Sequence, residues 1–187
     1  MVSINIDAKQ MEQMAKQVAH IKDGVPRVMA AAINRALSKG KTVVKKEIRK
    51  VYMIKARDIP IAVVRATFTR MNGHVLIQSG MLPLSDFPHT PRVRTARTSG
   101  KPIKVTVKKG QGGKLRTGFL TTFKSGHIGI YKRIGKEPLP IQELRSIGAP
   151  IMAAQPQVGP AASKAISETF AQRLDHEIKR VLAREAK

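Results

Sequence analysis

Apolar residues recur at helical spacing near both ends of the chain. Between residues 25 and 51 they are three, four or seven positions apart, and Lys and Arg occupy the other side, which predicts an amphipathic helix over 25–51. A short helix is expected before it, over 9–20. A closing helix is expected over 161–186, where apolar residues recur every fourth position: Ala162, Ile166, Phe170, Leu174, Ile178 and Leu182.

Three local features qualify these helices. Gly40 lies inside the long pattern and costs about 1 kcal/mol relative to Ala, which leaves room for a break there. The run Ala30-Ala31-Ala32 would let another backbone approach closely. The triplet Asp175-His176-Glu177 is expected to lie on the solvated side of the closing helix and not to form a metal site.

From residue 61 the pattern changes to short runs with strand character. Alternating or β-branched residues predict five extended segments, which are 61–70, 75–78, 103–107, 119–123 and 128–131. Gly73 and Gly126 mark expected hairpin turns. The order of elements is therefore helix, helix, sheet, helix.

Proline and glycine interrupt the strands. Residues 83–102 and 138–160 are punctuated by prolines, and 108–114 holds three glycines in four positions, which predicts a flexible basic loop. The length of 187 residues fits one domain over 1–187. Its expected parts are a helical part over 1–58, a sheet with basic loops over 59–136, a connector over 137–160 and a C-terminal helix over 161–187.

Composition limits the class of protein. An apolar fraction of 42% suffices for a core, and no apolar run approaches the roughly 18–20 residues of a membrane span. The absence of cysteine removes disulfides, thiolate metal sites and cysteine nucleophiles. The first residues lack a charged start leading into an apolar stretch, so we expect no secretory signal and synthesis in a cytoplasm.

The charge is one-sided. The chain holds 35 Lys and Arg against 12 Asp and Glu, a formal +23, and Asp86 is the only acid between Asp58 and Glu137. Such an excess favours a polyanionic or acidic partner. Few aromatics accompany these cations, which favours sequence-independent phosphate contact over base stacking, the alternative being a generic cationic surface. The candidates for facing DNA or an acidic partner are Arg92, Arg94, Arg97, Lys101, Lys104, Lys108, Lys109, Lys114 and Arg116.

No catalytic constellation is evident in the sequence. The five histidines are scattered, and none pairs with another at the i, i+4 spacing of a zinc site. The segment 110–114 lacks the glycine spacing and the Ser or Thr of a phosphate loop. We therefore predict no catalytic residue, no metal and no cofactor, so the protein is not expected to be an enzyme. A nuclease or maturation enzyme is a weaker alternative, because the sequence lacks the clusters of acids and histidines that such an enzyme needs.

The order of several short motifs resembles a known family. Val25-Pro26 and the run Ala31 to Ala36 open the long helix, Gly118-Phe119-Leu120 and residues 124–133 follow, and then comes Leu139-Pro140-Ile141. This order is similar to the minor tail protein Z family of phage lambda and related prophages, a group of tail completion proteins. The likeness covers most of the chain and is strongest in residues 25–58 and 117–150.

The resemblance implies an architecture and a role. Related neck proteins are α+β, with N-terminal and C-terminal helices packed on a mainly antiparallel sheet of about four strands. The family implies a virion structural protein in the tail neck, a ring expected to be hexameric, that enables head–tail joining and DNA passage. The implied partners are a tail terminator, the tail tube and an adaptor or connector, with DNA backbone contact and no membrane.

The sequence leaves two alternatives for the basic segment and two for the chain as a whole. The segment 101–116 either lines a DNA channel or acts as an arm that clasps an acidic neighbour. The chain as a whole is either this ring protein or a free-standing, sequence-independent nucleic-acid-binding protein. The candidate subunit-interface residues are Tyr131, Arg133, Pro140, Ile141, Leu144 and Ile147.

Overall fold

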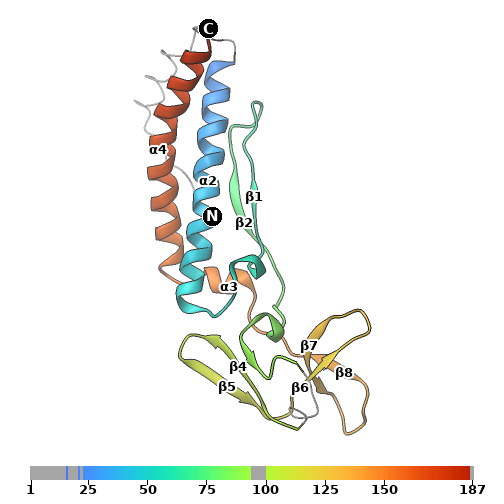
Figure 1. The fold of residues 1–187 in the computed structure, drawn as a ribbon. Helices are drawn as coiled ribbons and strands as arrows, with labels where there is room; N and C mark the ends of the chain where they lie inside the picture. Colours follow the sequence, from blue (N-terminus) through green and yellow to red (C-terminus); the bar gives the residue numbers. More distant parts are fainter. Residues whose placement is uncertain (1–15, 17–20, 22, 94–99, 186–187) are drawn as a thin grey trace. The chain divides into compact units, whose positions relative to one another are not determined.

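The computed structural model describes residues 16, 21, 23–93 and 100–185 (Figure 1). Of the helix predicted over 9–20, only Lys16 lies within the described residues, and it is helical. The chain forms two compact units. Unit 1 comprises Met1–Glu47, Ile61–Ile77 and Ala154–Lys187, and unit 2 comprises Ile48–Pro60 and Gln78–Ala153. Whether the whole chain folds as the single predicted domain stays a prediction.

Two long helices dominate unit 1. Helix α2 spans Gly24–Val51, with its last four residues in unit 2, and α4 spans Val158–Glu185. Both predicted helices are confirmed to within a few residues. They run side by side in Figure 1, and α2 continues through Gly40 without a break. The two apolar stripes bury each other in a common core, as their helical spacing requires. That core includes Val28, Ala32, Ile33, Ala36, Leu37, Ile166, Phe170, Leu174 and Ile178.

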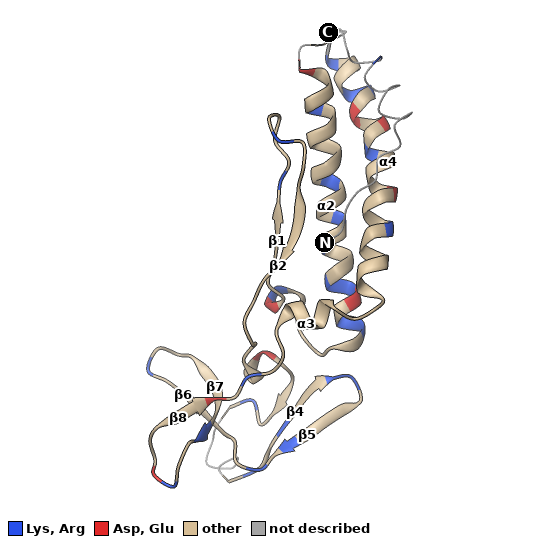
Figure 2. Cartoon of the chain, turned by 180° about the vertical axis from the view of Figure 1, so that it is seen from behind, with Lys and Arg blue, Asp and Glu red and all other residues tan. Residues whose placement is uncertain are grey.

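A β-hairpin lies beside α2 in unit 1 (Figures 1 and 2). Strands β1, Ile61–Val64, and β2, His74–Ile77, pair antiparallel with Ile61 opposite Ile77. The predicted strand over 61–70 therefore ends early. The Asn34 side chain fixes the hairpin, because its amide donates to the Ala66 carbonyl at 3.0 Å and its oxygen accepts from the Ala66 amide at 2.8 Å. The Ala-Ile-Asn-Arg motif thus joins α2 to this hairpin.

The expectation that Asp175, His176 and Glu177 all lie on the solvated side of the closing helix is wrong for Glu177. Asp175 and His176 are exposed on α4, but Glu177 is only 4% exposed. It follows Leu174 by three residues, so the helical turn brings it to the edge of the apolar stripe. The Arg180 guanidinium lies 2.6 Å from its carboxylate and provides the counter-charge.

Unit 2 contains two three-stranded antiparallel sheets. One has the order β3-β4-β5, with β3 at His89–Thr90, β4 at Ile103–Lys108 and β5 at Gln111–Leu115. The other has the order β6-β7-β8, with β6 at Phe119–Thr122, β7 at Ile128–Arg133 and β8 at Ile141–Glu143. The α+β class is confirmed, but three small sheets replace the single expected sheet of about four strands. Prolines and turns between the strands keep each sheet short.

The predicted connector over 137–160 contains regular secondary structure. It holds β8, the short helix α3 at Ala149–Ala153 and the start of α4. The Ala149 amide at the start of α3 donates to the Ser79 hydroxyl at 2.9 Å. A Cβ on Gly148 would lie 2.6 Å from the Gly80 carbonyl oxygen, so glycine permits this close approach. Two single-turn 3₁₀ helices, Ala56–Asp58 and Leu84–Asp86, complete unit 2.

Candidate functional site

The β4–β5 hairpin presents a basic face. Ile103 and Val105 are buried, whereas Lys104 between them is exposed, as alternation along a strand requires. Lys104 lies directly opposite Lys114 of β5 in the register. Both ammonium groups therefore share one face, and like charges in that position repel. An anion bound across this pair would relieve the repulsion.

The segment 108–114 is not the flexible loop that its glycines predict. Residues 111–115 form β5, in which Gly112 pairs with Thr106 and Gly113 pairs with Val105. The turn lies at Lys109 and Gly110, where Gly110 has a φ of +75°, and the register shifts between Thr106 and Lys108. Backbone hydrogen bonds to β4 are sufficient to order a glycine-rich strand once its partner is in place.

The basic turn is anchored to the end of α2. The Lys109 amide donates to the Val51 carbonyl at 2.9 Å, and the Met53 amide donates to the Val107 carbonyl at 2.8 Å. The Lys108 ammonium lies 5.8 Å from the centroid of the buried Tyr52 ring, within the range of a cation–π contact. The turn is therefore held by residues far from it in sequence.

All the described basic candidates are exposed and belong to unit 2. Lys101 precedes β4, Arg116 follows β5, and Arg92 follows β3. Arg94 and Arg97 lie outside the described residues. By sequence, unit 2 carries 18 Lys and Arg against 4 Asp and Glu, a formal +14 of the +23 total. Figure 2 shows basic and no acidic positions on the β4–β5 hairpin. Contact of these residues with DNA or an acidic partner stays a prediction.

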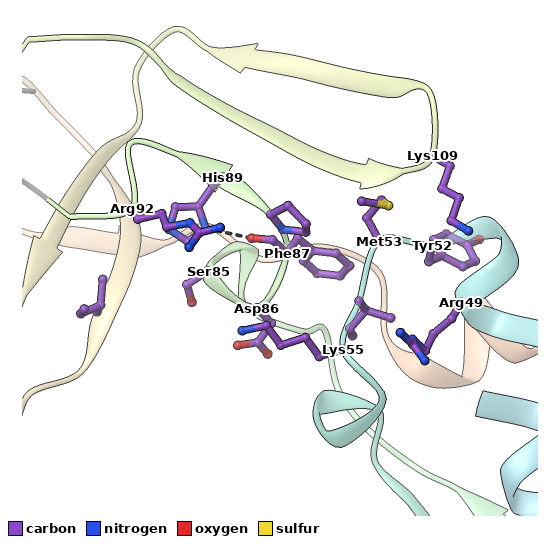
Figure 3. Close-up of a pocket in the computed structure, with 13 residues that line it drawn as sticks. Arg49, Tyr52, Met53, Lys55, Ser85, Asp86, Phe87, His89, Arg92 and Lys109 are labelled. Carbon is purple, nitrogen blue, oxygen red and sulfur yellow. Dashed lines mark hydrogen bonds between the residues drawn. The ribbon is translucent and has the colours of Figure 1, made fainter. Parts of the chain in front are cut away.

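A cleft of about 620 Å³ lies within unit 2. Its apolar lining comes from Tyr52, Met53, Ile54, Phe87, Pro88 and Ile128. Arg49, Lys55, Arg92 and Lys109 contribute cations, and Asp86 is the one acid in the lining. In Figure 3, Arg92 lies at one end and Arg49 and Lys109 at the other, with Met53 and Phe87 between them.

Hydrogen bonding and burial shape the wall of this cleft. The His89 Nδ1 lies 2.8 Å from the Phe87 carbonyl oxygen, so the imidazole N–H donates there (Figure 3). Burial raises the pKa of Asp86, and the carboxylates of Asp58 and Glu143 raise it further, opposed by His127 and Lys55. Both effects disfavour the ionised carboxylate.

The predicted interface residues occupy different environments. Tyr131 is only 8% exposed, and its ring covers Gly129 and meets Phe123 edge-on at 5.3 Å. Arg133 is exposed, with its guanidinium 5.3 Å from the Phe119 ring centroid. Pro140 is exposed, whereas three residues are half-buried: Ile141, Leu144 and Ile147. Tyr131 serves the packing of its own sheet, and the interface assignment as a whole stays a prediction.

Sequence reasoning missed two groups of residues. Arg49 and Lys55 join the cleft, although nothing in their spacing relates them to Arg92 or Lys109. Ile134 and Leu139, at the turn between β7 and β8, are 64% and 70% exposed. Their position next to Arg133 and Pro140 is a local signal that would have extended the predicted interface.

The described residues hold neither a candidate metal site nor a candidate membrane span. Among them, no three His, Cys, Asp or Glu side chains are grouped so that they could hold a metal ion. None of the helices in the described part of the chain has the length and apolar character needed to cross a membrane.

Fold and surface together define a basic α+β protein whose exposed cations are arranged on a hairpin and around an apolar cleft. The chain matches the family model of prophage minor tail protein Z (GPZ) over residues 8–186, and it belongs to that family. It is therefore a structural protein of a phage tail and a component of the virion. Searches of curated proteins and of solved structures found no match.

Proposed function

We propose that this tail protein is a tail completion protein that forms a ring in the neck, at the head-proximal end of the tail. The ring, expected to be a hexamer, makes the finished tail competent to join the head and lets DNA pass. It acts by shape and charge and catalyses no reaction. Membership of a tail protein family supports this proposal, together with the concentration of +14 formal charge in unit 2.

Charge gives the ring its role in DNA passage. Several copies arranged around a channel would sum their positive potential where the DNA enters. The Lys104–Lys114 face of the β4–β5 hairpin is suited to contact phosphates without reading sequence, because its exposed groups are ammonium ions on a regular strand pair. Such contacts weaken as salt rises.

A cyclic ring also needs two different complementary surfaces on each subunit. We propose that the turn between β7 and β8 supplies one of them. Its exposed Ile134 and Leu139 extend the predicted interface of Arg133, Pro140 and Ile141. The ring would then contact the tail terminator, the tail tube and the adaptor or connector of the head.

Deletion of the gene tests this role. We expect tails of normal length that do not join heads, with infectivity restored by the gene in trans. Electron microscopy of lysates measures tail length and the joined fraction, and plaque counts measure infectivity. Tails that join heads normally without the protein would refute the proposal. Tails of altered length would point to a role in tube assembly.

The Lys104–Lys114 face also favours a second candidate function, free-standing nucleic-acid binding. That function predicts that the isolated protein binds duplex DNA tightly, with a log–log salt slope of several units. Fluorescence anisotropy with a labelled duplex measures this, starting near 50 mM salt. Negligible binding under those conditions excludes the second candidate and leaves the ring proposal standing.

A further inference from the structure

The cleft of unit 2 is a separate feature from the basic hairpin face. Its four cations come from four segments: the end of α2, the residues after it, the residues after β3, and the β4–β5 turn. Phe87 and Met53 lie between the cationic ends (Figure 3). A surface made only for phosphates would have no need of this apolar centre.

Size and charge narrow the choice of occupant. A volume of about 620 Å³ lies in the range of roughly 300–1,000 Å³ that holds small ligands, so it admits a few side chains and excludes a DNA duplex. A second copy of this chain is a poorer occupant of the cleft itself, because the chain offers few carboxylates, with 12 Asp and Glu against 35 Lys and Arg. Because the lining of the cleft holds four cations and one acid, we expect the occupant to supply carboxylates.

We propose that the cleft binds an acidic segment of another tail or neck protein, in which carboxylates flank an apolar side chain. The inference deepens the proposed function and rests on it only for the identity of the partner. The apolar side chain packs on Met53 and Phe87. The flanking carboxylates pair with Arg92 at one end and with Arg49 and Lys109 at the other.

The residue types in the cleft suit both the apolar contact at its centre and the ion pairs at its ends. Arg guanidinium groups accept a carboxylate in a two-bonded fork, which orients the segment along the cleft. An apolar centre surrounded by charged positions is also the usual plan of a protein-binding surface. Lys55 and Asp86, the one acid of the lining, both lie between the two ends of the cleft (Figure 3). Arg49, Arg92 and Lys109 lie at the ends, where they can pair with the flanking carboxylates.

Peptide binding to the purified full-length protein tests the inference. The probe is a fluorescein-labelled acidic hexapeptide with a Leu-Phe pair at its centre, followed by anisotropy. Two matched peptides replace that pair with serines or the acids with lysines. We expect saturable binding of the first peptide, weakened at least about tenfold in both matched peptides.

Variants locate the binding site. Arg49→Glu and Arg92→Glu should each weaken binding about tenfold or more, whereas Lys124→Glu, an exposed charge outside the cleft lining, should change it less than about twofold. Arg49→Gln provides a milder variant if the charge reversal impairs folding, which thermal melting by circular dichroism reports. Equal loss in Lys124→Glu would indicate general electrostatic attraction and would overturn the inference.

Other outcomes identify other occupants and would also overturn it. Displacement of the peptide by a short DNA duplex, sensitive to Arg49→Glu, would assign the cleft to phosphates. Self-association that is lost in Arg49→Glu would assign it to a second copy. If peptide binding fails while the gene deletion blocks head joining, this inference fails and the proposed function stands. If the peptide binds but deletion of the gene leaves head joining intact, the proposed function fails and this inference stands.

Discussion

Gly40 of α2 and Ile166 of α4 meet where the two helices pack against each other. A Cβ on Gly40 would lie 2.6 Å from both the Cδ1 and the Cγ1 atoms of Ile166. Ile166 is only 2% exposed, so its side chain would have to move within the packed core to make room. The glycine that weakens the helix locally is therefore the residue that permits the helices to approach.

Gly40→Ala should destabilise the protein. Alanine improves helix propensity by about 1 kcal/mol, but overpacking of a core contact costs roughly 1–3 kcal/mol. We expect a net loss in the free energy of unfolding by urea. Adding Ile166→Ala to the Gly40→Ala protein should cost less than Ile166→Ala alone, because it makes room for the new methyl group. An increase in stability from Gly40→Ala would contradict this contact.

Lys104→Glu should stabilise the hairpin while weakening contact with polyanions. The change converts a repulsive cross-strand pair with Lys114 into an attractive one, worth about 0.2–1 kcal/mol. Urea unfolding at low salt measures the gain. Lys104→Glu combined with Lys114→Glu restores a like-charge pair, so it should return stability to about the wild-type value. A larger gain in the double variant would contradict the pairing.

Phe170→Ala should destabilise by about 3–5 kcal/mol, because the ring is buried in the core between α2 and α4. Equilibrium unfolding followed by circular dichroism measures the change. Phe68→Ala is the matched control, since Phe68 is 60% exposed and its loss should cost about 0.5 kcal/mol or less. Equal losses in the two variants would show that Phe170 does not form part of the core.

Asp86→Asn should raise the Tm at pH 7. Because burial and nearby carboxylates raise the pKa of Asp86, the folded protein holds this proton more tightly than the unfolded chain does. The free energy of unfolding therefore falls as the pH rises from about 4 through the raised value. The asparagine variant lacks this loss, so its advantage should shrink below about pH 4.

Asp175→Asn, on the exposed face of α4, is the matched control for removing a carboxylate. Differential scanning calorimetry between pH 3 and 8 measures both variants. A Tm of Asp86→Asn at or below the wild-type value at pH 7 would contradict the shift.

Local patterns predicted the helices well. The stripe from Ala162 to Leu182 repeats every four residues, and the helix that it predicts differs from α4 by only a few residues at its ends. The predicted bounds of the strands were less accurate, because β1 ends at Val64 and the prediction extended to residue 70. Strand ends depend on the partner strand, and the sequence does not specify that partner.

The glycine-rich segment 108–114 shows the same limit. Its composition indicates flexibility, but pairing with β4 orders residues 111–115. Burial of Glu177 also escaped prediction, because an acid at the edge of an apolar stripe is buried or exposed according to the neighbouring helix. In each case a non-local contact outweighed the local preference.

The amino-acid pattern by itself determined the two long helices, the positive charge, the family motifs and the turn before β7, where Gly126 has a φ of +80° and its amide donates to the Phe123 carbonyl. These depend on composition or on residues a few positions apart. The tertiary structure alone decided that Arg49 and Lys55 share a cleft with Arg92 and Lys109. Hydrogen bonds between the end of α2 and the β4–β5 hairpin bring these distant residues together, and no short-range period in a sequence encodes such a contact.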